Sequence, residues 1–202
     1  MLAAKPGASP LSEPSASETS EDSILVSAAR AGDRTAFGHL YERYARMVHG
    51  MLLARVPHSE VDDLVQDVFM LALRRLSTLR ESGKFGAWLA AIARNRANDY
   101  HRQSTPEGPS PDDLHDQEIE SATTSGDQAT PAAILEVIKS LPSAYRETLI
   151  LRLIEGMTGP EIAARTGMTH GSVRVNLHRG MQQLRAKLGS SPSEGDSQQE
   201  KG

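Results

Sequence analysis

The chain has 202 residues, a formal net charge of −4 at pH 7 and no cysteine. Without cysteine, a disulfide framework and any thiolate metal or redox site are excluded. The sequence shows neither an apolar run of about 18 residues nor an apolar stretch behind a basic start. We therefore expect no membrane span, no secretory signal and a cytoplasmic location.

Aromatic residues are scarce, with three Phe, one Trp and four Tyr, and this composition favours packed helices over a β-sandwich. Charge is distributed unevenly. Residues 1–22 (−3), 104–130 (−7) and 189–202 (−2) are acidic, whereas residues 23–103 and 131–188 each carry +4. Two basic segments suit a polyanionic partner such as nucleic acid.

The first basic segment indicates a helical domain over residues 22–103. Residues 1–21 are rich in Ser, Pro, Ala and Glu without an apolar period, which is typical of a disordered tail. Apolar side chains then recur three or four residues apart, a pattern that predicts helices over about Ser23–Ala31, Asp33–Pro57, Ser59–Leu76 and Lys84–Gln103.

A second helical domain is expected over residues 131–188, so the predicted fold is all-α with two small domains. The stretch from Ser104 to Thr130 contains proline, glycine and seven acidic residues but no Lys or Arg. This composition predicts a flexible acidic linker, either a plain spacer or a segment with a role of its own. Residues 189–202 are expected to be a disordered tail.

The second segment contains the pattern of a helix-turn-helix. Thr158 and Glu161 form a capping box, Gly167 can close the first helix with a positive φ, and Thr169 can cap the second helix. Val173 and Leu177 would face inward, while the opposite face is basic and suits the DNA major groove. The alternative is an αα-hairpin whose basic face is only solvated.

Two ordered sets of residues resemble a known family. The second segment resembles region four of extracytoplasmic-function sigma factors in Leu141-Pro142, Arg146, Glu161-Ile162-Ala163, Gly171-Ser172-Val173-Arg174 and Leu177-His178-Arg179-Gly180. The first segment resembles region two in Ala36-Phe37, Leu40-Tyr41, Tyr44, Asp62 through Phe69, Phe85 through Leu89, Ala91 through Arg96 and Asp99-Tyr100. The resemblance covers about residues 22–103 and 131–188.

The resemblance implies a protein that binds core RNA polymerase, at its β′ clamp and β flap, and directs promoter-specific initiation. Among the residues that the resemblance implicates in polymerase binding, Gln66 and Asp67 follow Asp63 by three and four positions, so the three share one helix face. Carboxylates there suit arginine partners. A merely solvated acidic face is the alternative. The full set is Asp62, Asp63, Gln66 and Asp67.

The resemblance also implies two DNA sites. The loop Leu79–Gly83 and the helix after it would capture an unstacked base of the −10 element and melt the duplex, through Lys84, Arg94, Asn95, Arg96, Asp99, Tyr100 and Arg102. The −35 element would be read by His170, Ser172, Arg174, Val175, His178 and Arg179. Val175 departs from the polar residue common in the family, and this leaves the −35 sequence open.

Other partners and functions follow from the same comparison. The family implies an anti-sigma factor as a partner, although no residue of this chain identifies one. We expect no cofactor, no metal site and no enzymatic activity, since no acid–base pair, phosphate loop or nucleophile motif is present. The competing hypothesis is a helix-turn-helix regulator in which the first segment is a helical sensor domain.

Overall fold

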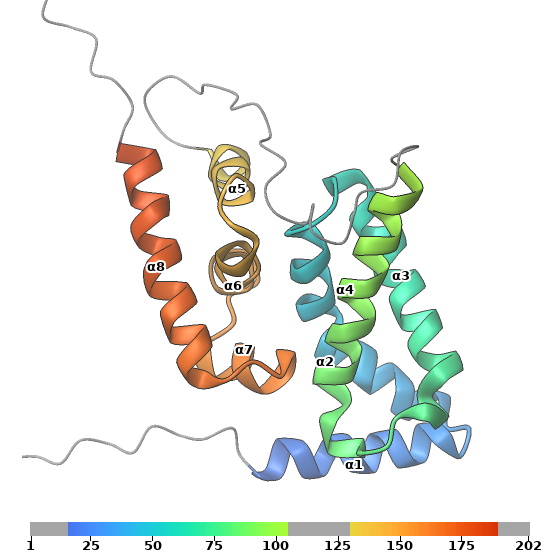
Figure 1. Cartoon of the computed structure of the whole chain (residues 1–202). Coiled ribbons are helices and arrows are strands. Elements are labelled where there is room, and N and C mark those ends of the chain that lie inside the picture. The colour runs from blue at the N-terminus through green and yellow to red at the C-terminus, as the bar shows by residue number, and fades with distance from the viewer. Residues whose placement is uncertain (1–15, 105–129, 190–202) are drawn as a thin grey trace, which may run out of the picture.

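The computed structural model describes residues 16–104 and 130–189 (Figure 1). The expected linker was residues 104–130, and of these residues 105–129 lie outside the described ranges, as do most of both expected tails. The described residues form α-helices and two short 3-10 helices, without a strand. The helices are α1 (Ala16–Arg30), α2 (Arg34–Leu53), α3 (His58–Arg75), η1 (Leu76–Thr78), η2 (Ser82–Lys84), α4 (Phe85–Ser104), α5 (Pro131–Lys139), α6 (Ser143–Leu153), α7 (Gly159–Thr166) and α8 (His170–Gly189).

The helices α1 to α4 form the first bundle. The Asp33 side chain accepts hydrogen bonds from the backbone N–H groups of Thr35 and Ala36, at 2.8 and 3.1 Å, and so caps α2 as expected. Apolar side chains at helical spacing on α2 and α3 are buried against α4, whose Phe85 and Leu89 are fully enclosed. These residues belong to one continuous apolar core, which also includes buried side chains of α5 to α8.

The start of α1 corrects the sequence prediction. The helix begins at Ala16, whereas residues 1–21 were expected to be disordered and the helix to begin at Ser23. Tertiary contacts explain the difference, because Arg43 of α2 binds Glu21 at 2.6 Å and Asp22 at 2.8 Å. Asp22 is buried and also accepts a hydrogen bond from the Tyr44 hydroxyl. Local composition carries no sign of these partners.

The helices α5 to α8 form the second bundle, and its local signals behave as predicted. Thr158 and Glu161 make both bonds of the capping box, with Thr158 N to Glu161 Oε2 at 2.7 Å and Glu161 N to Thr158 Oγ1 at 3.4 Å. Gly167 closes α7 with φ +75°, a left-handed conformation that favours glycine. Thr169 Oγ1 accepts a bond from Ser172 N at 3.1 Å at the start of α8. The helix-turn-helix is therefore confirmed.

The two bundles pack against each other, which the sequence did not indicate. In Figure 1, α6 and α7 lie beside α2 and α4, and these elements are in direct contact. Arg146 of α6 donates to the Ala54 carbonyl at 3.3 Å across this boundary. Within the described ranges, no helix is long and apolar enough to cross a membrane, and no cluster of three or more His, Asp or Glu could hold a metal ion.

Candidate nucleic-acid interface

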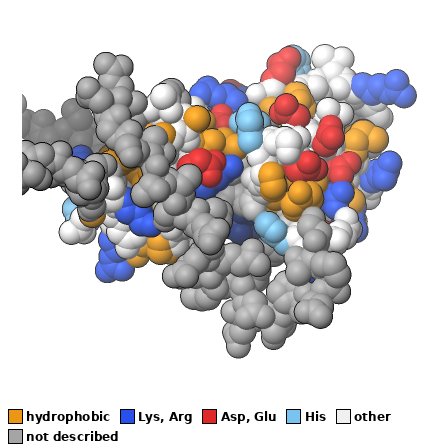
Figure 2. Space-filling view, turned by 90° about the horizontal axis from the view of Figure 1, so that it is seen from above, with side chains coloured by type: hydrophobic (Ala, Val, Ile, Leu, Met, Phe, Trp, Pro, Cys, Tyr) orange, Lys and Arg blue, Asp and Glu red, His pale blue; other side chains and the backbone are white. Residues whose placement is uncertain are grey.

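The outer face of α3 is acidic and free of covering helices. Asp62, Asp63, Gln66 and Asp67 are all exposed, whereas Leu64, Val65 and Val68 on the opposite side are buried. Figure 2 shows acidic side chains gathered on the side of the molecule that the first bundle occupies. The structure therefore brings these four predicted residues together on one accessible surface, where carboxylates can meet arginine side chains of a partner.

The structure does not place all the predicted −10 residues on one surface. Asn95, Asp99 and Arg102 follow one side of α4, and the Arg102 guanidinium binds the Asp99 carboxylate. Arg96 turns toward α3, where its Nη2 lies 2.5 Å from Asp67 Oδ2 and so joins the two predicted surfaces. Tyr100 is partly buried against the apolar core. Lys84, at the end of η2, is exposed and pairs with Glu81 at 2.8 Å.

Arg94 points away from this surface and into the second bundle. Its Nη2 lies 2.7 Å from Glu147 Oε1, and Arg55 Nη2 lies 2.8 Å from Glu147 Oε2. Only 6% of the Glu147 side chain is exposed. Burial by itself raises the pKa of the Glu147 carboxyl, but the hydrogen bonds and charges of Arg94 and Arg55 outweigh burial and hold this pKa below its usual value. Glu147 is therefore a charged, buried link between the bundles.

A second buried carboxylate lies at the same boundary. Glu155 follows α6, and its side chain is 9% exposed. His49 Nδ1 of α2 lies 2.7 Å from Glu155 Oε1, and the Arg46 guanidinium binds the Glu155 backbone carbonyl. The hydrogen bond to Glu155 raises the pKa of His49, against the opposing effect of burial, with smaller contributions from the charges of Glu155 and Asp62. The contact with Glu155 therefore favours the protonated form of His49 at the boundary of the bundles.

This pair predicts a pH-dependent contribution to stability. Because folding raises the pKa of His49 above the ordinary 6.5, its contribution is complete below that value and is lost as the pH rises through the folded pKa. We expect wild type to have a higher free energy of unfolding than His49→Gln. This stability gap should be roughly 1 kcal/mol larger at about pH 6 than at about pH 8.5. Urea titrations at both pH values check this, and an equal gap at the two values would contradict it.

The helix-turn-helix docks on the first bundle through α7. The Arg165 guanidinium lies 5.9 Å from the centre of the Tyr44 ring, and Arg165 Nη1 donates to the Arg43 carbonyl at 3.2 Å. Gly86, at the start of α4, has no Cβ where the Arg165 backbone passes, since an added Cβ would lie 2.7 Å from the Arg165 carbonyl oxygen. The non-recognition helix of the motif is therefore the one held by the first bundle.

The second helix of the motif, α8, has two unlike faces. Val173 and Leu184 are buried, and Gly180 of the same face packs against Leu149. All six predicted −35 residues are exposed, so the structure brings them together on the outer side of α8. The exposed members are His170, Ser172, Arg174, Val175, His178 and Arg179. A helix with this free basic face has the dimensions and donors to enter a major groove.

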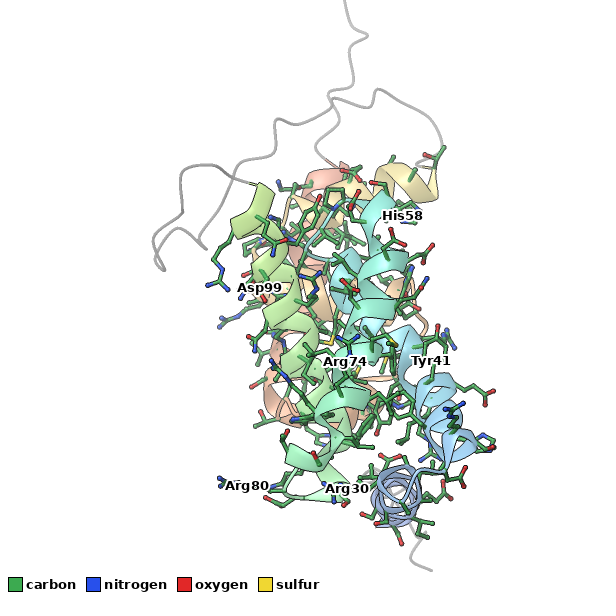
Figure 3. All side chains as sticks on the ribbon, turned by 90° about the vertical axis from the view of Figure 1, so that its right-hand side faces the viewer. Arg30, Tyr41, His58, Arg74, Arg80 and Asp99 are labelled. Atoms are coloured by element: carbon green, nitrogen blue, oxygen red, sulfur yellow. The ribbon has the colours of Figure 1, made fainter. Side chains whose placement is uncertain are left out.

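Sequence reasoning missed several charged residues beside the loop between α3 and α4. Figure 3 shows Arg30 and Arg80 at the lower end of the first bundle and Arg74 higher up, between that end and His58 at the start of α3. Arg74 and Arg80 are exposed, and the run of arginines between residues 74 and 80 was a visible signal of a basic surface. For Arg30, and for Glu147 and Glu155, no comparable local signal exists.

Two family models match the chain. Residues 40–106 match sigma-70 region 2, and residues 132–184 match sigma-70 region 4. The chain belongs to the sigma-70 family. The match to region 2 accounts for the first bundle and does not favour the competing hypothesis of a sensor domain. The protein is a sigma factor, the class that directs transcription initiation to promoters.

Relatives place this sigma factor in the extracytoplasmic-function (ECF) group. It is 31% identical over 166 residues to the ECF RNA polymerase sigma factor BldN of Streptomyces coelicolor, a match that covers 79% of this chain and 63% of BldN. It is 29% identical over 184 residues to the ECF RNA polymerase sigma-E factor of Escherichia coli (strain K12), covering 85% of this chain and 96% of that protein.

A solved structure shares the helical fold. CnrH in complex with the cytosolic domain of CnrY is similar with a TM-score of 0.59 and 27% sequence identity, covering 85% of this chain and 99% of CnrH. This confirms the all-α fold class expected from the sequence, with helices from both bundles included in the match.

Proposed function

We propose that this sigma factor binds core RNA polymerase with the acidic face of α3 and holds promoter DNA with α4, the preceding loop and α8. One observation carries the proposal. Both α3 and α8 bury an apolar face and expose a charged face, which is acidic on α3 and basic on α8. Residues 22–103 would form the polymerase-binding and −10 domain, and residues 131–188 the −35 domain, joined by the acidic segment 104–130.

Polymerase binding would use ion pairs on a rigid helix. Asp62, Asp63 and Gln66 are exposed, and no side-chain hydrogen bond or ion pair within the described residues occupies Asp63 or Gln66. The charge of Asp62 acts on His49 but leaves its carboxylate exposed, so all three can accept bonds from a basic surface. Asp67 already binds Arg96 and would exchange or share that partner. By analogy with the family, the surface they meet is the β′ clamp, while the second domain would meet the β flap.

Promoter melting would use the stripe on α4. Asn95 and Asp99 can address base edges, and Arg102 can neutralise phosphate. Extrusion of a base costs a few kcal/mol, which hydrogen bonds and stacking offset. Arg94 can join this surface only after Glu147 releases it, so engagement of DNA by Arg94 requires the two bundles to separate.

Reading of the −35 element would use the exposed face of α8. Arg174 and Arg179 can bond guanine or phosphate, and Val175 can contact a thymine methyl group. Linking two weak DNA sites on one polymerase raises their effective concentration, so specificity would appear in the assembled enzyme rather than in the free chain.

The remaining expectations are proposals of the same kind. CnrH has been solved in complex with the cytosolic domain of CnrY. We propose that this chain also binds a protein partner, an anti-sigma factor that holds it inactive. We propose that the chain works in the cytoplasm and acts by binding alone, without turnover of a substrate and without a cofactor.

The decisive experiment adds the purified protein to core polymerase and measures promoter-specific transcripts. We expect the double variant Asp63→Ala/Gln66→Ala to weaken holoenzyme assembly at least tenfold, because charged hydrogen bonds of about 1.5–3 kcal/mol are lost. Asp67 is left in place because it holds Arg96. A matched control, Glu42→Ala/Glu136→Ala, removes exposed acids elsewhere and should assemble normally. Full-strength assembly of the double variant would refute this mode of binding.

A further inference from the structure

The loop between α3 and α4 is held from outside by the last residue of α1. Arg30 Nε donates to the Leu76 carbonyl at 3.1 Å, Nη1 donates to Ser82 Oγ at 3.3 Å, and Nη2 donates to the Leu79 carbonyl. One guanidinium therefore bonds both the beginning and the end of the segment that resembles the base-capturing loop. No carboxylate within the described residues pairs with Arg30.

Arg30 acts here through its several hydrogen-bond donors rather than through an ion pair. A guanidinium carries five donors in one plane and no acceptor, so a single side chain can bond several oxygens at fixed angles. Leu76 and Leu79, whose carbonyls it binds, are both buried. The other bonds of this loop within the described residues are local. Thr78 Oγ1 donates to the Arg75 carbonyl at 2.7 Å, Leu79 N donates to the Leu76 carbonyl at 3.3 Å and Lys84 N donates to the Glu81 carbonyl at 2.9 Å, beside the exposed pair Lys84–Glu81. Arg30 is therefore the side chain that ties the two ends of the loop to α1.

We propose that Arg30 is a positioning residue that holds the loop Leu79–Gly83 in the shape needed to capture the unstacked −10 base. The role given to the loop rests on the proposed function, whereas the hydrogen bonds from Arg30 to the loop are seen in the structure itself. It gives a role to α1, which precedes the segment matched by the region 2 model, residues 40–106. A loop held in its bound shape avoids the entropy cost of ordering when DNA arrives.

The test compares Arg30→Met, Arg30→Lys and the control Arg34→Met in holoenzyme. Arg34 is exposed at the start of α2, close to Arg30 in sequence but outside the loop contact. We expect Arg30→Met to lower open-complex formation, and the preference for the natural base at the captured position, about tenfold each. Arg30→Lys should fall between, because an ammonium group cannot reach all the oxygens. Core binding should be unchanged.

Salt dependence separates positioning from a direct phosphate contact. Loss of one phosphate contact lowers the slope of log affinity against log salt by roughly 0.7–0.9. Loss of a positioning bond leaves the slope unchanged. A reduced slope with base preference intact, or equal behaviour of Arg30→Met and Arg34→Met, would overturn the proposal.

Amide hydrogen exchange of the free protein gives a readout that needs no promoter. We expect Arg30→Met to speed exchange in residues 79–84 and to leave the middle of α2 unaffected. Unchanged exchange would overturn the proposal. If wild type initiates at no promoter while loop exchange still responds to Arg30→Met, the proposed function fails and the positioning contact stands.

Discussion

Replacing Glu147 with alanine should lower the free energy of unfolding by about 3–5 kcal/mol, the usual cost of removing one partner from a buried ion pair. The change leaves Arg55 and Arg94 facing each other at the boundary of the two bundles without their shared carboxylate. Urea unfolding measures the loss. Glu136→Ala is the matched control, since Glu136 is an exposed glutamate whose ion pair, among the residues that the structure describes, is with Lys139 on its own helix.

The stability lost in Glu147→Ala should also depend on pH. Because folding lowers the pKa of Glu147, its stabilising contribution is complete above the ordinary value of 4.5 and is lost as the pH falls through the folded pKa. The difference between wild type and Glu147→Ala should therefore shrink in acid. A variant as stable as the Glu136→Ala control near neutral pH would show that Glu147 does not join the bundles.

Gly50→Ala is expected to separate the bundles, although alanine is the better helix former. Gly50 lies in α2, and an added Cβ would lie 2.7 Å from Glu155 Cγ and 2.9 Å from Leu151 Cδ2. Leu151 is fully buried, so it has no room to withdraw. Such overpacking costs about 1–3 kcal/mol, more than the helix propensity gain of about 1 kcal/mol at most.

Gly38→Ala provides the control for Gly50→Ala on the same helix. Nothing lies within 4 Å of a Cβ added at Gly38, so this variant should gain stability from helix propensity alone. The chain has no cysteine, so the pair Ser77→Cys and Gln183→Cys gives two unique labels, one on each bundle. We expect the distance between labels to lengthen in Gly50→Ala and to stay unchanged in Gly38→Ala. An unchanged distance in both would mean that the bundles do not meet at Gly50.

Local signals in the sequence determined the helices, the helix-turn-helix and the two charged faces. The capping box of Thr158 and Glu161 and the left-handed Gly167 act within a few residues, so residue type and spacing define them. The free faces of α3 and α8 follow from apolar periodicity, which tells which side of a helix is buried. The family resemblance then supplied their function.

Only the tertiary structure decided which charged residues meet. Glu147 resembles any acid on an amphipathic helix until Arg55 and Arg94 enclose it, and those partners lie 92 and 53 residues away. Arg30 bonds a loop 46 to 52 residues further along the chain. Periodicity describes one element at a time and carries no information about the element opposite. Contacts between elements depend on how the bundles pack, and this is why Arg94 was predicted to face DNA but is bound to Glu147.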